Sequence, residues 1–76
     1  MNPLIELFAE CLKVPAASLS DESSTDSVRN WDSLAAMNLV VAIEERYEIQ
    51  LSTREIMSMR SIGKAREVLK KKGVNV

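Results

Sequence analysis

The chain has 76 residues and a formal net charge of −1, with 46% hydrophobic and 28% charged residues, a balance typical of one folded domain. It contains no histidine and one cysteine, which excludes serine–histidine triads, histidine-containing zinc sites and disulfides within the chain. Only carboxylates remain for acid–base catalysis, so we expect a single non-catalytic domain over residues 1–76. Met1-Asn2-Pro3 does not resemble a signal peptide, and no apolar run could span a bilayer, which together indicate a cytoplasmic protein.

The first helix is expected from Pro3 to about Lys13, with Asn2 as its N-cap and Pro15 as its stop. We expect Cys11 to be a buried structural thiol rather than a reactive one, because it falls within the apolar stripe of this helix. The stripe recurs at helical spacing and consists of Leu4, Leu7, Phe8 and Cys11, widened by Ile5 and Leu12.

Residues 14–31 form a long connection rich in serine, threonine and aspartate. A loop of this length needs apolar side chains that hold it against the core. Leu19, Val28 and Trp31 are the candidates. Trp31 is most simply an anchor of the loop, and a direct contact with a partner is the alternative.

The second helix is expected from Ser33 to Tyr47, with Asp32 as its N-cap. At 100° per residue it has two apolar sides. The side expected to face the core holds Ala36, Leu39, Val40, Ile43 and Tyr47, and the other side holds Leu34, Met37, Asn38, Val41, Glu44, Glu45 and Glu48. Exposed apolar groups beside acids favour a docking surface, and the alternative is that another helix covers them.

Two further helices follow. Ile49-Gln50-Leu51 reads as an extended link, and Ser52-Thr53-Arg54-Glu55 fits a capping box that opens a short helix ending near Met59. Ser61 caps the last helix, which ends before Gly73. Its apolar stripe is Ile62, Ala65, Val68 and Leu69. The sequence therefore predicts an all-α fold, a small four-helix bundle of three longer helices and one short helix.

Trp31-Asp32-Ser33-Leu34, where a long loop meets an acidic amphipathic helix, resembles the acyl carrier proteins, and so does Glu44-Glu45-Arg46-Tyr47-Glu48-Ile49 at the end of that helix. The resemblance extends over essentially the whole chain. It implies a discrete carrier in which Ser33 is the attachment point of 4′-phosphopantetheine, added from coenzyme A by a phosphopantetheinyl transferase. The thiol of that arm, rather than a protein side chain, then holds the acyl group as a thioester.

The same resemblance implies which residues meet other proteins. Asp32 belongs to the motif that the transferase recognises, and it can serve as N-cap as well. The partners implied are the transferase and the enzymes that load and transfer acyl groups. The positions that match partner contacts in the family are Asp32, Leu34, Met37, Asn38, Val41, Glu44 and Glu45.

The chain departs from the carriers of bacterial fatty acid synthesis in its charge. Residues 1–53 carry three basic and nine acidic side chains, whereas residues 54–76 carry seven basic and two acidic ones. Ala35, Ala36, Met37 and Asn38 follow the Ser-Leu pair in place of acids, which predicts weak electrostatic steering. The resemblance therefore favours a specialised polyketide, nonribosomal-peptide or related pathway, with fatty acid synthesis as the alternative.

Other functions are less favoured by the sequence. A non-catalytic helical interaction domain, in which Ser33 merely starts a helix, is the other class that it leaves open. We expect a monomer that binds no nucleic acid, because a large basic surface and aromatic stacking residues are missing. We also expect it to bind no membrane and hold no metal, since it has no apolar run long enough to span a bilayer and no histidine.

Overall fold

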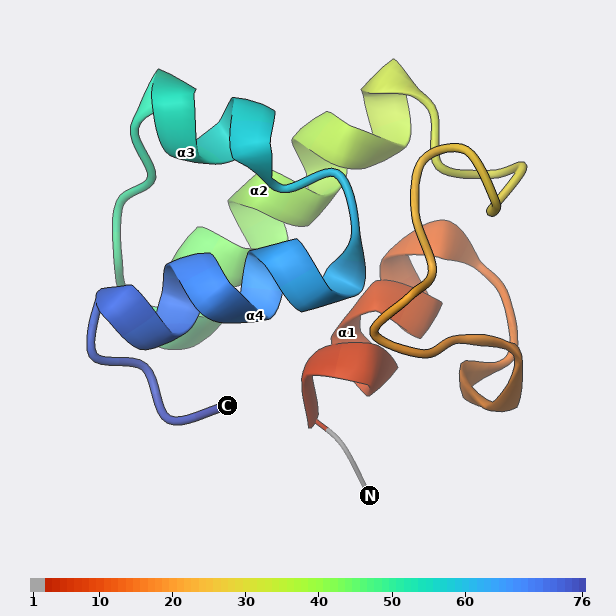
Figure 1. Ribbon diagram of the computed structural model, residues 1–76, viewed down its shortest axis with the longest axis horizontal. Helices are drawn as coiled ribbons and strands as arrows, with labels where there is room; N and C mark the ends of the chain where they lie inside the picture. The colour runs from red at the N-terminus through yellow and green to blue at the C-terminus, as the bar shows by residue number, and fades with distance from the viewer. Residues whose placement is uncertain (1–2) are drawn as a thin grey trace.

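The computed structural model describes residues 3–76, which form four α-helices and one short 3-10 helix (Figure 1). These are α1 (Pro3–Leu12), η1 (Ala16–Ser18), α2 (Ser33–Tyr47), α3 (Thr53–Ser58) and α4 (Ile62–Lys71). Within residues 3–76 there is no strand, only an isolated antiparallel bridge between Ser24 and Ser61. The predicted all-α fold, with three longer helices and one short one, is confirmed. The predicted N-cap Asn2 lies outside the described residues.

Local capping signals set the ends of the helices. The side chains of Asp32 and Ser61 each accept a hydrogen bond from the backbone N–H three residues further on. Ser52 and Glu55 form the complete capping box at the start of α3. After α4, Gly73 adopts φ 88°, a left-handed conformation that favours glycine. The boundaries predicted from these residues are therefore confirmed.

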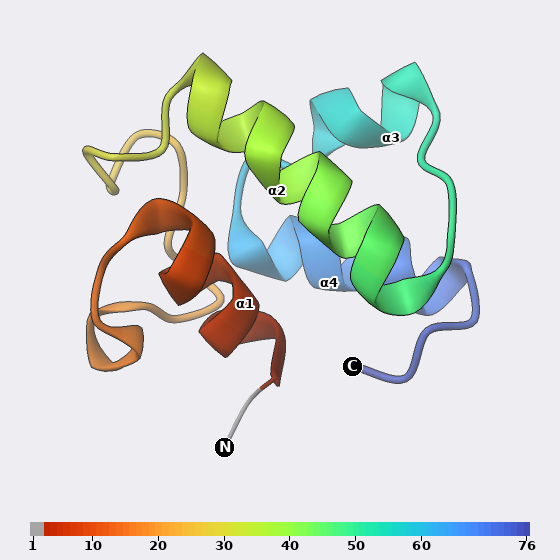
Figure 2. The same ribbon diagram turned by 180° about the vertical axis from the view of Figure 1, so that it is seen from behind.

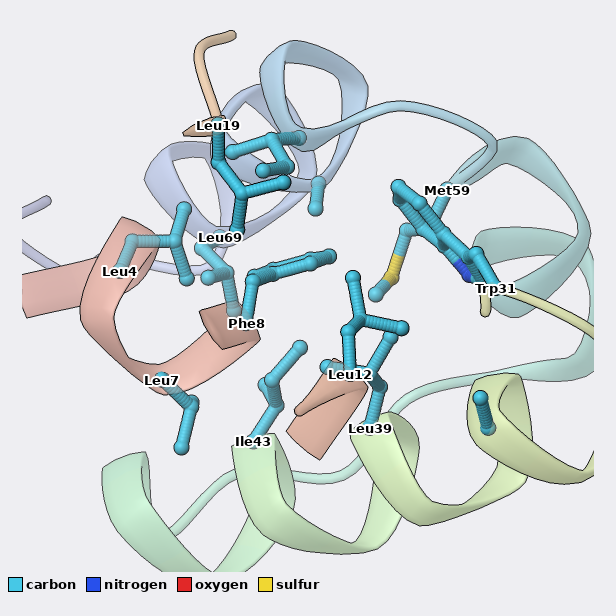
Figure 3. Packing of buried hydrophobic residues seen from close by; sticks show 13 residues of the cluster. Leu4, Leu7, Phe8, Leu12, Leu19, Trp31, Leu39, Ile43, Met59 and Leu69 are labelled. Carbon is cyan, nitrogen blue, oxygen red and sulfur yellow. The ribbon is translucent and has the colours of Figure 1, made fainter. Parts of the chain in front are cut away.

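One apolar core joins α1, α2 and α4 (Figure 3). Phe8 lies fully buried within it and meets Trp31 edge-on, with ring centroids 5.2 Å apart. The other buried members of the cluster come from α1, α2, α4 and the segments between the helices: Leu4, Leu7, Leu12, Leu19, Ala35, Leu39, Ile43, Met59, Ile62, Ala65 and Leu69. Burial of these side chains supplies the main driving force for folding.

Three residues predicted on the core side of their helices pack against the core cluster but are only partly buried. Ala35 rather than Ala36 is the buried alanine of α2, and Ala36 is only half-buried. Cys11 is also half-buried and packs against the core cluster from outside it. Tyr47 is half-buried as well. By the angular count these side chains lie among the buried positions of their helices, so their partial exposure depends on how the neighbouring elements cover them; Ala36, for example, lines a small pocket.

The long connection between α1 and α2 is held by the core. Leu19 and Trp31 are both buried, as predicted, and Val28 is half-buried against the same cluster. The burial of Trp31 assigns it to the core and leaves little of its surface for a partner. These contacts fix a segment that has no regular structure except η1.

The same connection is also tied to the start of α4. Ser23 O accepts a hydrogen bond from Ile62 N at 3.0 Å, and Asp21 O accepts one from Gly63 N at 2.8 Å. A Cβ at Gly63 would lie 3.0 Å from Asp21 O, so any larger residue here would force the loop backbone to shift. The Asp21 carboxylate accepts two hydrogen bonds from the Arg66 guanidinium, at 2.8 and 3.1 Å. The loop that leads to α2 therefore has a defined path.

Candidate functional site

The start of α2 presents a serine hydroxyl to solvent. Ser33 is the first residue of the helix and is exposed. Asp32 precedes it as the N-cap, and its Oδ1 accepts a hydrogen bond of 2.9 Å from Ala35 N. Figure 2 shows the first turn of α2 at the end of the molecule that lies away from the C-terminus. An exposed hydroxyl in this place is accessible to the active site of another protein.

The Ser33 hydroxyl is not used by the fold. Among residues 3–76 it has no hydrogen-bond partner, and neither do the backbone N–H groups of Ser33 and Leu34. The next two N–H groups of the helix are both satisfied by Asp32. Unpaired N–H groups at a helix N-terminus favour a negatively charged group beside them. The site therefore combines a free nucleophile with an environment suited to a phosphodiester.

Two neighbouring residues position this site. Trp31 is only 5% exposed and packs against Phe8, which fixes the chain two residues before Ser33. Asn30 Nδ2 donates a hydrogen bond of 3.0 Å to Leu12 O at the end of α1. The hydroxyl of Ser33 thus projects from a rigid point, although the loop before it is long.

The exposed side of α2 is apolar, as the sequence predicted. Leu34, Met37 and Val41 are 72%, 58% and 51% exposed, and Asn38 beside them is also exposed. Their spacing places the three apolar residues on one face of the helix. The alternative interpretation, in which another helix covers them, is wrong for the part of the chain that the structure describes.

The acidic residues at the end of α2 differ in their surroundings. Glu44 is half-buried, and its Oε2 accepts a hydrogen bond of 2.8 Å from Leu51 N. Glu44 therefore holds the link between α2 and α3. Glu45 and Glu48 are exposed, and Glu48 ends the helix with φ 52°. The structure brings Asp32, Ser33 and Leu34 together at the start of α2. The three glutamates lie at the other end: Glu44, Glu45 and Glu48.

A small apolar pocket lies behind the start of α2. It has a volume of about 20 Å³, enough for one water molecule. It is lined by Phe8, Trp31, Ala36, Leu39, Val40, Ile56 and Met59. The pocket thus belongs to the boundary between α2 and α3, next to the segment that carries Ser33.

The structure adds one exposed apolar residue that the sequence analysis did not single out. Met57 on α3 is 71% exposed. The neighbouring apolar residue of this helix, Ile56, is half-buried instead and lines the pocket. In the sequence, only the order of Ile56 and Met57 could have indicated which of the two is exposed. A helix of six residues is too short to show a clear helical periodicity.

Within residues 3–76 no cluster of histidine, cysteine, aspartate and glutamate side chains could hold a metal ion. Burial, with a smaller contribution from Glu10, raises the pKa of the Cys11 thiol, so Cys11 stays protonated at neutral pH.

No helix in the described part of the chain has the length and apolar character needed to cross a bilayer.

Comparisons with known proteins agree with this geometry. A family model described as a phosphopantetheine attachment site matches residues 2–69. The chain is 32% identical to an acyl carrier protein of Kineococcus radiotolerans over 66 residues, which cover 86% of this chain and 80% of that protein. It is 26% identical to an acyl carrier protein of Acidothermus cellulolyticus over 65 residues, which cover 86% and 77%. The solution NMR structure of a holo acyl carrier protein from Geobacter metallireducens is similar, with a TM-score of 0.80 and 29% identity over 91% of this chain and 79% of that one.

Proposed function

Because this chain belongs to the acyl carrier protein family, whose members are non-catalytic carriers with a covalent 4′-phosphopantetheine arm, we propose that Ser33 is the residue that bears the arm. The observation that carries this assignment is the exposed, unpaired hydroxyl at the first residue of α2. Residues 1–76 then act as a single carrier domain.

The surroundings of Ser33 support a phosphodiester at this position. The N–H groups of Ser33 and Leu34 have no partner among residues 3–76, and they lie at the positive end of the helix dipole. At an exposed site, this dipole stabilises a negative charge by about 0.3–1 kcal/mol. The residues present therefore fit the group that the family carries.

The chemistry of the carrier belongs to the arm and to other proteins. When attached, the arm supplies a thiol that forms a thioester with the acyl group. In this chain Ser33 holds the arm, Asp32 fixes the first turn of α2, and Trp31 anchors the chain before it. We propose that the transferase supplies the base that deprotonates Ser33, since this chain has no histidine.

We also propose that partner enzymes recognise the exposed side of α2 around Ser33. The transferase and the enzymes that load and transfer acyl groups would meet the carrier here as a monomer. The residues proposed for these contacts are Asp32, Leu34, Met37, Asn38, Val41, Glu44 and Glu45. The hydrogen bond of Glu44 to Leu51 N makes it the least available of the set.

For the pathway, we propose a specialised one, of the polyketide, nonribosomal-peptide or related kind. The net charge of −1 and the uncharged start of α2 support this assignment over fatty acid synthesis, which is the alternative. The expected cytoplasmic location stays a prediction. Intact-mass measurement of the protein from its native host tests the pathway, because the mass reports the attached cargo.

The test of Ser33 is mass spectrometry after incubation with a broad-specificity transferase and coenzyme A. We expect the wild type to gain one phosphopantetheinyl group and Ser33→Ala to gain none. Ser52→Ala is the matched control, because Ser52 also lies at a helix start but its hydroxyl accepts a hydrogen bond from Glu55 N. Modification of Ser33→Ala, or no modification of the wild type beside a carrier that is converted, would refute the assignment.

A further inference from the structure

The end of α1 leaves one backbone carbonyl for a side chain to satisfy. Lys13 follows the helix with φ 60°, and Val14 N donates a hydrogen bond of 3.1 Å to Ala9 O, which closes the helix as in a Schellman motif. Leu12 O takes no part in this closure and accepts a hydrogen bond of 3.0 Å from Asn30 Nδ2. A side chain of the loop before α2 therefore completes the last turn of α1.

Asn30 lies in a tight turn that leads directly to Ser33. Trp31 N donates a hydrogen bond of 3.0 Å to Val28 O, so Arg29 and Asn30 are the central residues of this turn. Figures 1 and 2 both show the turn beside the end of α1. The Asn30 bond joins parts of the chain that are 18 residues apart, and it connects α1 to the segment that carries Ser33.

The Asn30 side chain ties this segment to another helix in a way that Trp31 does not. Within residues 3–76, the backbone groups from Arg29 to Leu34 make hydrogen bonds only within the turn and α2 itself. Trp31 holds the same stretch by apolar burial, which is largely non-directional. A hydrogen bond weakens steeply as its angle departs from linear. Asn30 therefore restricts the orientation of the chain, and Trp31 restricts its distance from the core.

We propose, on the premise that Ser33 bears the arm, that Asn30 is a positioning residue for arm attachment. In this reaction the Ser33 oxygen attacks the phosphorus that carries the pantetheine of coenzyme A. The nucleotide part leaves as the phosphoanhydride bond breaks, and the base of the transferase takes the hydroxyl proton. The Asn30 amide fixes the turn against the end of α1, so that the hydroxyl meets the transferase already aligned.

Alignment of this kind affects the rate of the chemical step. A nucleophile reacts efficiently when it lies within about 3–3.5 Å of the atom that it attacks, and a misplacement of about 1 Å can cost about a hundredfold. Without the bond from Asn30 to Leu12 O, the transferase has to align a looser helix start in each complex.

The experiment measures arm attachment as a function of carrier concentration. The probe is a broad-specificity phosphopantetheinyl transferase with coenzyme A, and kcat and KM for the carrier are determined separately for the wild type, Asn30→Ala and Asn30→Asp. Aspartate has nearly the shape of asparagine, but its ionised carboxylate donates no hydrogen bond. We expect both variants to lose about three- to tenfold in kcat, a factor that the net free energy of one hydrogen bond allows.

The split between kcat and KM separates positioning from a merely structural role. The carrier is the substrate in this assay, so partial unfolding lowers the concentration of competent substrate, which raises the apparent KM and leaves kcat unchanged. Weaker binding to the transferase also raises KM. Misalignment in the bound complex lowers kcat instead. Asn30→Gln, which keeps an amide donor, should react faster than Asn30→Asp.

Trp31 gives a second readout, because it is the one tryptophan of the chain and follows Asn30 directly. We expect its fluorescence anisotropy to decay faster in Asn30→Ala and Asn30→Asp, with no transferase present. Arg29→Ala is the matched control. Arg29 is the other central residue of the turn, is exposed and makes no ion pair within residues 3–76. This variant should keep the kcat and the anisotropy decay of the wild type.

Three outcomes would overturn the role proposed for Asn30. The first is a kcat of the folded variants within about twofold of the wild type. The second is a loss that appears in KM alone, and the third is thermal unfolding of both variants below the assay temperature, which would show a structural role. Failure of the wild type to accept an arm at Ser33 would refute the proposed function itself, whereas normal attachment to both folded variants would refute only the positioning by Asn30.

Discussion

The start of α2 and the starts of α3 and α4 are capped in different ways, although each has a serine at or beside the cap. At α3, Ser52 Oγ accepts a hydrogen bond of 3.2 Å from Glu55 N, and at α4, Ser61 Oγ accepts one of 3.1 Å from Lys64 N. At α2 a carboxylate performs this task and the serine follows one position later. The Ser33 hydroxyl is therefore not needed as a helix cap.

This difference shows how a fold can keep a nucleophile both available and well placed. A serine at the cap position satisfies a backbone donor with its own oxygen, so the oxygen is occupied. Asp32 satisfies the donor instead, and Trp31 fixes the chain in the core. Met59 is a comparable buried residue before α4, two residues ahead of the cap Ser61, whereas Trp31 directly precedes the cap Asp32. Both helix starts therefore have a buried residue before them, and they differ in the N-cap, which is Asp32 at α2 and Ser61 at α4.

Removal of the anchor at the start of α2 should have the largest effect on stability. Trp31→Ala deletes a buried indole and its contact with Phe8, and loss of such a side chain costs about 3–5 kcal/mol. The free energy of unfolding in urea, followed by far-UV circular dichroism, measures this loss. Met59→Ala is the matched change before α4 and should cost about 2–5 kcal/mol.

The importance of the anchor would be disproved by a Trp31→Ala variant that loses less than about 1 kcal/mol. In that case the backbone contacts between the loop and α4 would be sufficient to place Ser33. The rate of arm attachment on the same variant then tells whether a stable fold with a mobile helix start still delivers the hydroxyl.

Removal of a helix cap should have the next largest effect on the free energy of unfolding. Substitution of Ser33, which caps no helix, should have a smaller effect. Asp32→Ala and Ser61→Ala each remove a cap and should cost about 1 kcal/mol. Ser33→Ala removes no hydrogen bond of the fold and should change the free energy of unfolding by less than about 0.5 kcal/mol. Urea titrations of the three variants test this order.

Asp32→Asn refines the cap prediction, because asparagine caps about as well as aspartate. This variant should keep the stability of the wild type while it loses the negative charge next to Ser33. A loss as large as that of Asp32→Ala would show that charge, rather than the hydrogen bond to Ala35 N, stabilises the start of α2.

The comparison also explains which features could be predicted from the sequence. Caps and stops depend on residues within a turn of one another, so Asp32, Ser52 and Gly73 gave correct helix boundaries. The exposed side of α2 was also predictable, because Leu34, Met37 and Val41 lie opposite the buried Leu39 and Ile43 at helical spacing.

Features that depend on distant parts of the chain could not be predicted. Nothing local indicates that Asp21 O meets Gly63 N, or that the carboxylate of Glu44 is bound by Leu51 N. The choice between Ala35 and Ala36 was beyond an angular count for a related reason. Two small adjacent side chains give little hydrophobic contrast, so the packing of α2 against α1 decides which is buried.

The smallest predicted effect concerns pH at the start of α3. The hydrogen bond from the backbone N–H of Ser52, followed by the bond from Lys72, lowers the pKa of the Glu55 carboxyl from its ordinary value of 4.5. A lowered carboxyl pKa stabilises the folded state above pH 4.5, and this contribution is lost as the pH falls through the folded-state pKa. In urea titrations, Glu55→Gln should therefore be less stable than the wild type at neutral pH, and the two should converge on acidification.

In a Lys72→Met background, the stability difference between the protein with Glu55 and its Glu55→Gln variant should shrink only in part, because the hydrogen bond from Ser52 N remains. A constant gap between wild type and Glu55→Gln at every pH would show that the capping box acts through geometry alone, as the cap of α4 does.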